Sequence, residues 1–126
     1  MKLSFALFLL LLSIHAQAEC WVVGNLQGMG TSKSDNYLYS KDGMTGQTFK
    51  IQASKEHSSV EPGDLDYFGI NQKSVIGVYT DGSSRTVETW NITYDNKNVL
   101  YTQMRTGFND MFDGSKSFVG TVISKC

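Results

Sequence analysis

Proline, histidine and cysteine are all scarce in this chain. One proline, two histidines and two cysteines occur in 126 residues, and only one histidine, His57, follows residue 18. A Ser-His-Asp or Cys-His catalytic arrangement would have to use His57, and the chain has no G-x-S-x-G motif. One histidine and two pairable cysteines are also too few for the three or four ligands of a zinc site. We therefore expect no metal and no cofactor, and we interpret His57 as an exposed loop residue.

Clusters of basic residues are missing as well. The chain has 11 Lys and Arg against 12 Asp and Glu, a net charge of −1, and no two basic residues are adjacent. A protein that binds nucleic acid displaces counterions from phosphates with clustered Lys and Arg. The sequence therefore argues against a nucleic-acid partner, and against an anionic membrane surface for the same reason.

The one long apolar run lies at the start of the chain. A single lysine precedes an apolar stretch from Leu3 to Ile14, which leads to the small-residue site Ala16-Gln17-Ala18. This pattern is typical of a secretory signal peptide, and the run is shorter than the roughly 20 residues needed to span a bilayer. We expect a signal peptide over residues 1–18 and a single domain over residues 19–126, located in the periplasm or secreted, with no stable membrane insertion.

The two cysteines, Cys20 and Cys126, stand at the two ends of the expected domain. A lipoprotein cysteine follows a small residue, whereas Cys20 follows the larger, charged Glu19. In an exported protein an even pair of cysteines predicts a disulfide. Closing so long a loop stabilises a fold by about 4–5 kcal/mol in the chain-entropy model.

The stretch from Lys73 to Met104 predicts a β-meander. Three runs rich in β-branched and aromatic residues are separated by turn-forming residues at 81–84 and 95–96. A turn at Asp95-Asn96 places Trp90 opposite Tyr101 and Ile92 opposite Val99, and we expect Trp90 and Ile92 in the core. For the hairpin at Asp81-Gly82, loops of three and of four residues both give plausible partners.

The remaining segments add strands to this meander. Strands are expected over Cys20–Gly30 and Ser117–Cys126, which the disulfide would bring side by side. A third, Gly46–Ala53, alternates with period two and places Phe49 and Ile51 in the core.

Two short features are expected between residues 37 and 43. Tyr37–Tyr39 is a short strand candidate, and Lys41–Gly43 is read as a turn. The class is all-β: a small antiparallel barrel or sandwich of about seven strands with one terminal disulfide.

The segment from Ser54 to Gln72 breaks the strand pattern, and we interpret it as a long loop. Loops of this length in compact domains are often functional. Its acidic and aromatic residues are the main candidates for binding a partner: Glu61, Asp64, Asp66, Tyr67 and Phe68. In the alternative, an apolar cluster closes one end of the barrel: Leu65, Phe68 and Ile70. A second candidate surface is the turn that carries Asp81 and Arg85.

Oxygen-bearing side chains form two further candidate sites. Asn109 to Gly114 resembles a calcium loop in composition but lacks the spacing and the late Glu of an EF-hand, so we read its Asn and Asp as turn formers. Asp64 and Asp66 would be the candidates for the acid and base of a small carboxylate-dependent hydrolase.

Leader, size, all-β pattern and disulfide placement resemble two groups of Gram-negative periplasmic proteins: lysozyme inhibitors, and immunity proteins against peptidoglycan-degrading toxins. The Ser-Gly-rich inhibitory loop of membrane-bound lysozyme inhibitors is not found, and Asp81–Arg85 resembles it only weakly. The resemblance implies an exported, non-enzymatic protein that binds another protein, such as a cell-wall hydrolase.

Two alternatives stay open. One is a barrel that carries a small ligand in a pocket lined by Phe49, Trp90, Tyr94 and Tyr101, and the other is the carboxylate-dependent hydrolase. The sequence also leaves a homodimer open.

Overall fold

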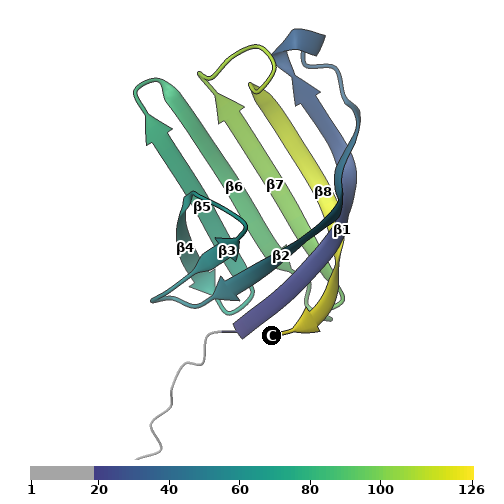
Figure 1. Cartoon of the computed structure of the whole chain (residues 1–126), viewed down its shortest axis with the longest axis vertical. Coiled ribbons are helices and arrows are strands. Elements are labelled where there is room, and N and C mark those ends of the chain that lie inside the picture. Colours follow the sequence, from purple (N-terminus) through teal and green to yellow (C-terminus); the bar gives the residue numbers. More distant parts are fainter. Residues whose placement is uncertain (1–18) are drawn as a thin grey trace, which may run out of the picture.

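The computed structural model describes residues 19–126, so the predicted signal peptide lies outside the described residues. The described part of the chain is all-β (Figure 1). Its elements in chain order are β1 (Glu19–Ser32), the 3-10 turn η1 (Lys33–Asp35), β2 (Ser40–Ala53), β3 (Ser59–Glu61), β4 (Asp66–Asn71), β5 (Ser74–Asp81), β6 (Ser84–Ile92), β7 (Asn98–Thr106) and β8 (Gly114–Lys125).

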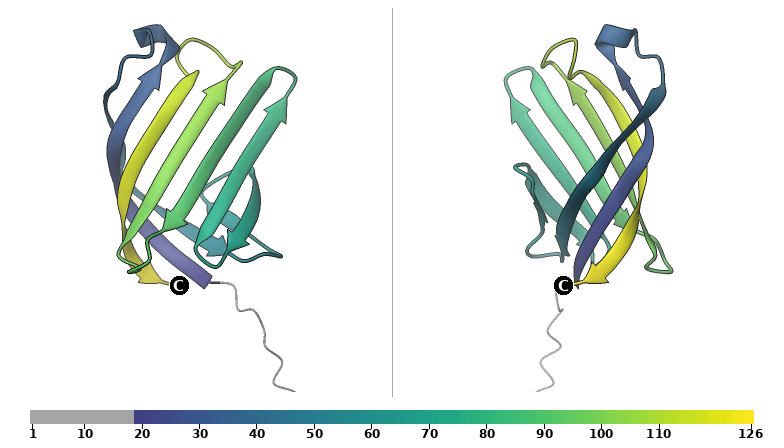
Figure 2. Two further views of the ribbon diagram at one scale, coloured as in Figure 1. Left: turned by 180° about the vertical axis from the view of Figure 1, so that it is seen from behind. Right: turned by 45° about the vertical axis from the view of Figure 1, so that its right-hand side comes forward.

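The eight strands form one antiparallel sheet that curls into a nearly closed barrel. The strand order is β3-β2-β1-β8-β7-β6-β5-β4, so every strand pairs with its neighbours in sequence except at the junction of β3 and β4. The first and last long strands, β1 and β8, lie side by side (Figure 2). This confirms the predicted antiparallel barrel and the pairing of the two chain ends, with eight strands in place of about seven.

The predicted meander has the predicted register. Trp90 pairs with Tyr101 and Ile92 pairs with Val99. The connecting loop is longer than two residues, because β6 ends at Ile92 and β7 begins at Asn98, but the register is unchanged and the N–H of Thr93 donates to the carbonyl of Asn98 at 2.9 Å. The β5–β6 hairpin is tighter than expected: Asp81 pairs with Ser84, which leaves a two-residue turn. Gly82 occupies its first position at φ +59°, a conformation that favours glycine in such turns.

Two expectations near the start of β2 were wrong. Lys41–Gly43 belongs to β2 and is not a turn, because β1 is long enough to pair with it as far as Gly30 opposite Ser40. Tyr37–Tyr39 is not a strand, since Asn36 and Tyr37 adopt left-handed φ values of 53° and 58° and the chain turns there.

The predicted long loop over Ser54–Gln72 is also corrected. It contains the short strands β3, which pairs with β2, and β4, which pairs with β5. In β4 the side chains alternate, so Tyr67 packs against the core while Phe68 and Ile70 are 58% and 52% exposed. The predicted cluster of Leu65, Phe68 and Ile70 is therefore wrong, because two of its members face outward.

The core fills the half of the barrel nearest the disulfide. Phe49, Ile51, Trp90 and Ile92 are all buried, as predicted. The ring centroid of Trp90 lies 5.0 Å from that of Phe49 and 4.4 Å from that of Tyr101. These three rings pack on one another in the core. Tyr94 lies apart from them, 97% exposed in the β6–β7 loop, where it lines a surface cavity of about 730 Å³ together with Ile92.

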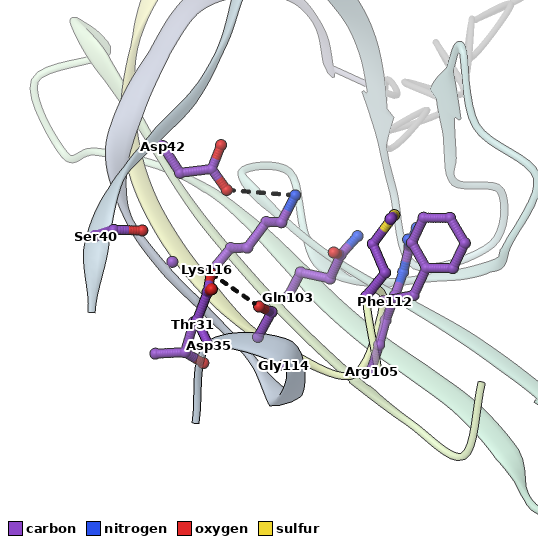
Figure 3. Close-up of a pocket in the computed structure, with 12 residues that line it drawn as sticks. Thr31, Asp35, Ser40, Asp42, Gln103, Arg105, Phe112, Gly114 and Lys116 are labelled. Atoms are coloured by element: carbon purple, nitrogen blue, oxygen red, sulfur yellow. Dashed lines mark hydrogen bonds and ion pairs between the residues drawn. The ribbon is translucent and has the colours of Figure 1, made fainter. Parts of the chain in front are cut away.

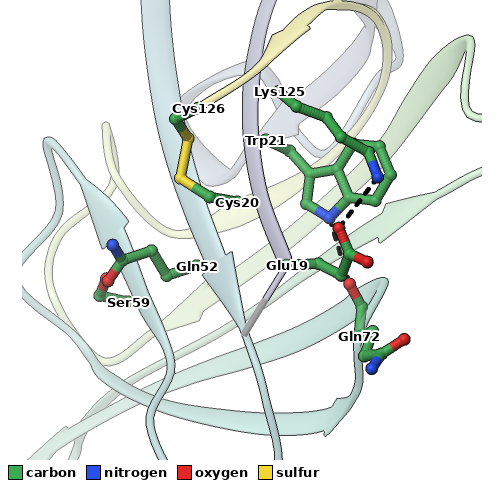
Figure 4. The surroundings of a disulfide bond; sticks show 8 residues. All are labelled: Glu19, Cys20, Trp21, Gln52, Ser59, Gln72, Lys125 and Cys126. Carbon is green, nitrogen blue, oxygen red and sulfur yellow. Dashed lines mark hydrogen bonds and ion pairs between the residues drawn. A yellow bond between two sulfur atoms is a disulfide. The ribbon is translucent and has the colours of Figure 1, made fainter. Parts of the chain in front are cut away.

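The disulfide between Cys20 and Cys126 is confirmed (Figure 4). Their Cα atoms are 5.2 Å apart, and the N–H of Cys126 donates to the carbonyl of Cys20 at 3.1 Å. Beside the bond, the ammonium of Lys125 lies 3.0 Å from a carboxylate oxygen of Glu19 and 4.8 Å from the ring centroid of Trp21. The disulfide thus holds β1 against β8 at one end of the barrel.

Replacing both cysteines with serine is expected to lower the free energy of unfolding by about 2–4 kcal/mol, because the bond closes a loop across 106 positions in the unfolded chain. Urea unfolding of the double variant and of the oxidised wild type measures the difference. Oxidised and reduced wild type that unfold at the same urea concentration would contradict this role.

Candidate binding site

The end of the barrel opposite the disulfide is formed by three connections, which we call the mouth: residues 33–39, the β5–β6 turn and residues 107–113 (Figure 1). These connections hold one another in place. The N–H of Lys33 donates to the carbonyl of Asp113 and that of Ser34 to the carbonyl of Asp110, both at 2.8 Å. The hydroxyl of Ser84 donates to the carbonyl of Gly107 at 2.7 Å. The mouth is therefore a continuous rim.

Below this rim the lining of the barrel is polar. The inward face of β6 continues from Trp90 through Glu88 to Thr86, and that of β7 continues from Tyr101 through Gln103 to Arg105. The sheet thus changes from an aromatic core to a polar lining within one strand length.

Glu88 is the most buried carboxylate of the described residues, at 7% exposure. Its Oε1 accepts hydrogen bonds from Trp90 Nε1 at 2.9 Å and from the hydroxyl of Tyr67 at 3.3 Å. Its Oε2 accepts from the hydroxyl of Tyr101 at 3.1 Å and from Gln103 Nε2 at 3.4 Å. Both oxygens are thus occupied by donors of the chain itself, as a buried carboxylate requires.

The two tyrosines of this network are perturbed in the direction expected from burial. Desolvation raises the pKa of Tyr101 well above its ordinary value, and the negative charge of Glu88 raises it further. The pKa of Tyr67 is raised by the same two causes in the same order. Both hydroxyls therefore stay protonated at neutral pH and serve as donors to Glu88.

Arg105 lies next to this network but takes no part in it. No carboxylate oxygen of residues 19–126 is within 4.0 Å of its guanidinium, and its Nε is buried without a hydrogen-bond partner. Its Cζ is 6.0 Å from the ring centroid of Phe112, which lies over it (Figure 3). Arg105 therefore keeps a positive charge at the mouth without a direct counter-ion from the described chain.

Two cavities meet at Arg105. The first has a volume of about 170 Å³ and is lined by polar residues of β1, β2 and β8, among them Thr31, Asp42 and Lys116 (Figure 3). Within it, Lys116 Nζ and Asp42 Oδ2 form an ion pair at 3.5 Å. The second cavity, of about 350 Å³, lies on the other side of Arg105, between it and Asp64.

Exposed apolar side chains lie on the connections at this end of the barrel, and three of them, Phe108, Met111 and Phe112, line the cavities. Tyr39 is 74% exposed and Met111 is 73% exposed, and both belong to the connections that form the rim. The full set of exposed apolar rim residues is Tyr37, Leu38, Tyr39, Phe108, Met111 and Phe112. Large exposed apolar groups grouped around a polar hollow are typical of an interaction surface.

The structure separates the residues that the sequence singled out. Asp64 lines the second cavity, and Tyr67 points into the barrel toward Glu88. The others are exposed: Glu61 at the end of β3, Asp66 and Phe68 on the outer side of β4, and Asp81 and Arg85 beside the β5–β6 turn. Arg85 bonds outward, from its Nε to the hydroxyl of Thr106 at 2.9 Å.

Sequence reasoning missed Glu88 and Arg105. The signal was present, because Trp90 and Tyr101 were expected in the core and strand alternation places Glu88, Gln103 and Arg105 on the same face. The alternation of side chains along the meander strands is therefore sufficient to predict that these polar residues face inward.

The loop that resembles a calcium loop in composition, Asn109 to Gly114, is held by its own side chains. Asp113 accepts backbone hydrogen bonds from Gly107 and Phe108, and Asn109 Oδ1 accepts from Met111 and Phe112. The bond from the Phe108 N–H is the largest of the effects that lower the pKa of Asp113. These side chains act as turn formers, and no group of three or more His, Cys, Asp or Glu side chains is gathered anywhere in residues 19–126.

Comparisons with family models, with curated proteins and with solved structures found no match for this chain. Within the described range, no helix has the length and apolar character needed to cross a membrane.

Proposed function

We propose that this chain is an exported, non-enzymatic binding protein that takes a protein partner at the mouth of the barrel. The observation that carries the proposal is the combination of an exposed apolar rim with a polar hollow that contains Arg105. Tyr, Phe, Met and Arg are enriched in the buried centre of protein interfaces, where a few residues contribute most of the binding free energy. The rim carries exposed Tyr, Phe and Met side chains, and the hollow that it borders contains Arg105.

A protein partner fits the size of the hollow better than a large free ligand does. Pockets for drug-sized ligands usually enclose about 300–1,000 Å³. The first cavity, at about 170 Å³, is smaller than that range, and the second, at about 350 Å³, lies near its lower limit. Cavities of this size suit one or two side chains of a partner whose surface covers the rim.

The predicted export and the disulfide support a partner in the periplasm or outside the cell. The resemblance to lysozyme inhibitors and immunity proteins makes a cell-wall hydrolase the partner to test first. On this proposal the chain is an inhibitor or immunity protein that works by occupying the surface of that enzyme.

A carrier of a small polar ligand is the second candidate. It is favoured by one observation, that two cavities share a charged residue. The carboxylate-dependent hydrolase has no such support, because Asp64 lines the second cavity whereas Asp66 lies on the outer side of β4.

The test compares a rim variant, Leu38→Ser with Met111→Ser, against the outer-wall variant Phe68→Ser, which removes a side chain of similar exposure. Wild type is used to capture proteins from a periplasmic extract, and a captured protein is then purified and titrated with each variant by calorimetry. We expect the rim variant to bind at least about tenfold more weakly, a loss of roughly 1.4 kcal/mol, while Phe68→Ser binds like wild type. Unchanged binding by the rim variant would contradict the proposal.

A further inference from the structure

We infer that Arg105 recognises a carboxylate group of the bound partner or ligand. This inference rests on the proposed function and names the chemistry at its centre. Three features of the described residues carry it: the unpaired charge of Arg105, the space around it, and the charges that border that space.

The charge of Arg105 has no direct partner inside the barrel. The buried carboxylate on the neighbouring strand β6 is Glu88, two residues from Thr86, the register partner of Arg105. Both oxygens of Glu88 already accept hydrogen bonds from neutral donors. The buried Nε therefore keeps an unused N–H. A partly buried cation without a hydrogen-bonded counter-ion lowers the free energy of unfolding. An anion that enters one of the two cavities would pair with this charge and remove that cost.

The neighbours of Arg105 leave space on both sides of the guanidinium. Arg105 pairs with Gly114 on β8 and with Thr86 on β6, one residue without a side chain and one with a short one. A Cβ at Gly114 would lie 1.9 Å from the carbonyl oxygen of Thr31, so β1 and β8 require glycine there. Phe112 covers one face of the guanidinium, which leaves the N–H groups at its edge to approach a planar anion.

The charges around the first cavity favour a singly charged anion. Lys116 is already paired with Asp42, and Asp35, which also lines the cavity, accepts a hydrogen bond from the hydroxyl of Ser32 at 3.3 Å. These carboxylates would repel a doubly charged phosphate more strongly than a carboxylate. Bidentate pairing with a carboxylate is also the geometry that arginine fits best.

The source of the carboxylate is either a small free acid or an Asp or Glu side chain of a protein. Both are tested with Arg105→Gln, which keeps a hydrogen-bonding side chain but removes the charge. Arg85→Gln is the matched control, because Arg85 stands beside Arg105 in the same sheet but points outward to Thr106. Arg105→Gln is expected to keep the melting temperature of the wild type within a few degrees, since the change removes no hydrogen bond or ion pair within the described chain and loses only the contact with the half-exposed ring of Phe112.

In the first arm, isotope-labelled protein is titrated with sodium acetate, and with acetamide as the neutral control, at constant ionic strength. Acetate is expected to shift the Arg105 Nε–H signal and the backbone signals of residues 112–114 in wild type and in Arg85→Gln. In the second arm, Arg105→Gln is titrated with the partner captured by wild type, before and after amidation of the carboxyl groups of the partner. Dependence on Arg105 in the acetate arm alone assigns a free acid, and in the partner arm a protein side chain.

The inference is overturned if Arg105→Gln matches the wild type in both arms. If partner binding then still depends on Leu38 and Met111, the proposed function stands while the role of Arg105 falls. If the acetate shifts depend on Arg105 but the rim variant binds the partner normally, the carboxylate site stands and the proposed rim interface falls.

Discussion

Replacing Glu88 with alanine is expected to lower the free energy of unfolding by about 3–5 kcal/mol. The change removes the shared acceptor of Trp90 Nε1, Gln103 Nε2 and two tyrosine hydroxyls. Of these, Trp90 Nε1 can only donate, and no other acceptor is recorded for it in the described part of the chain. The loss therefore comes from buried donors left without a partner, and urea unfolding followed by tryptophan fluorescence measures it.

Glu88→Gln is the matched control for this prediction. The amide oxygen can accept from Trp90 and Tyr67, while the amide nitrogen can donate to the hydroxyl of Tyr101, which also accepts. We expect Glu88→Gln to retain most of the stability that Glu88→Ala loses. Equal stability of Glu88→Ala and wild type would show that the network contributes nothing to the fold.

Replacing Trp90 with alanine is expected to destabilise the barrel by about 3–5 kcal/mol. Trp90 is 2% exposed and packs between Phe49 and Tyr101, so its removal leaves a cavity in the centre of the core. The variant also removes one of the donors to Glu88. Chemical unfolding of the variant and the wild type gives the difference.

Tyr94→Ala serves as the control, since Tyr94 is an aromatic residue near the end of the same meander run but is 97% exposed. A surface substitution of this kind should change stability by no more than about 0.5 kcal/mol. A loss below about 1 kcal/mol for Trp90→Ala would mean that Trp90 lies at the surface, and would reopen a binding role for it.

The parts of the fold that were predictable are those set by local pattern. The alternation in 46–53 and in the meander identifies which face is buried, and turn residues fix the pairing of Trp90 with Tyr101. The disulfide could be predicted from the expected export and the even number of cysteines.

The segments that were missed have weak local signals and depend on partners far away in the chain. The strand β3 has three residues and forms by pairing with β2, and β4 forms against β5. The first residues of β2, around Lys41–Gly43, read as a turn because of their composition, but they extend because β1 continues opposite them. Tertiary pairing overrides local preference at each of these places.

The candidate site was only partly predictable for the same reason. Strand alternation could have shown that Glu88 and Arg105 face inward. It could not have shown that Tyr67 of β4 reaches Glu88, or that Phe112 of the β7–β8 loop covers Arg105. Those contacts join strands and loops whose placement depends on closure of the barrel.

Hydrogen–deuterium exchange of the chain with and without its captured partner tests the central claim, that the mouth is the binding end, most directly. Backbone amides buried by a partner exchange more slowly, so the footprint of binding is read along the chain. The account predicts new protection in the three connections of the mouth, which are residues 33–39, the β5–β6 turn and residues 107–113. It predicts unchanged exchange in the edge strand β4 and in the β6–β7 loop at the opposite end. Protection confined to β4 or to the end that carries the disulfide would contradict it.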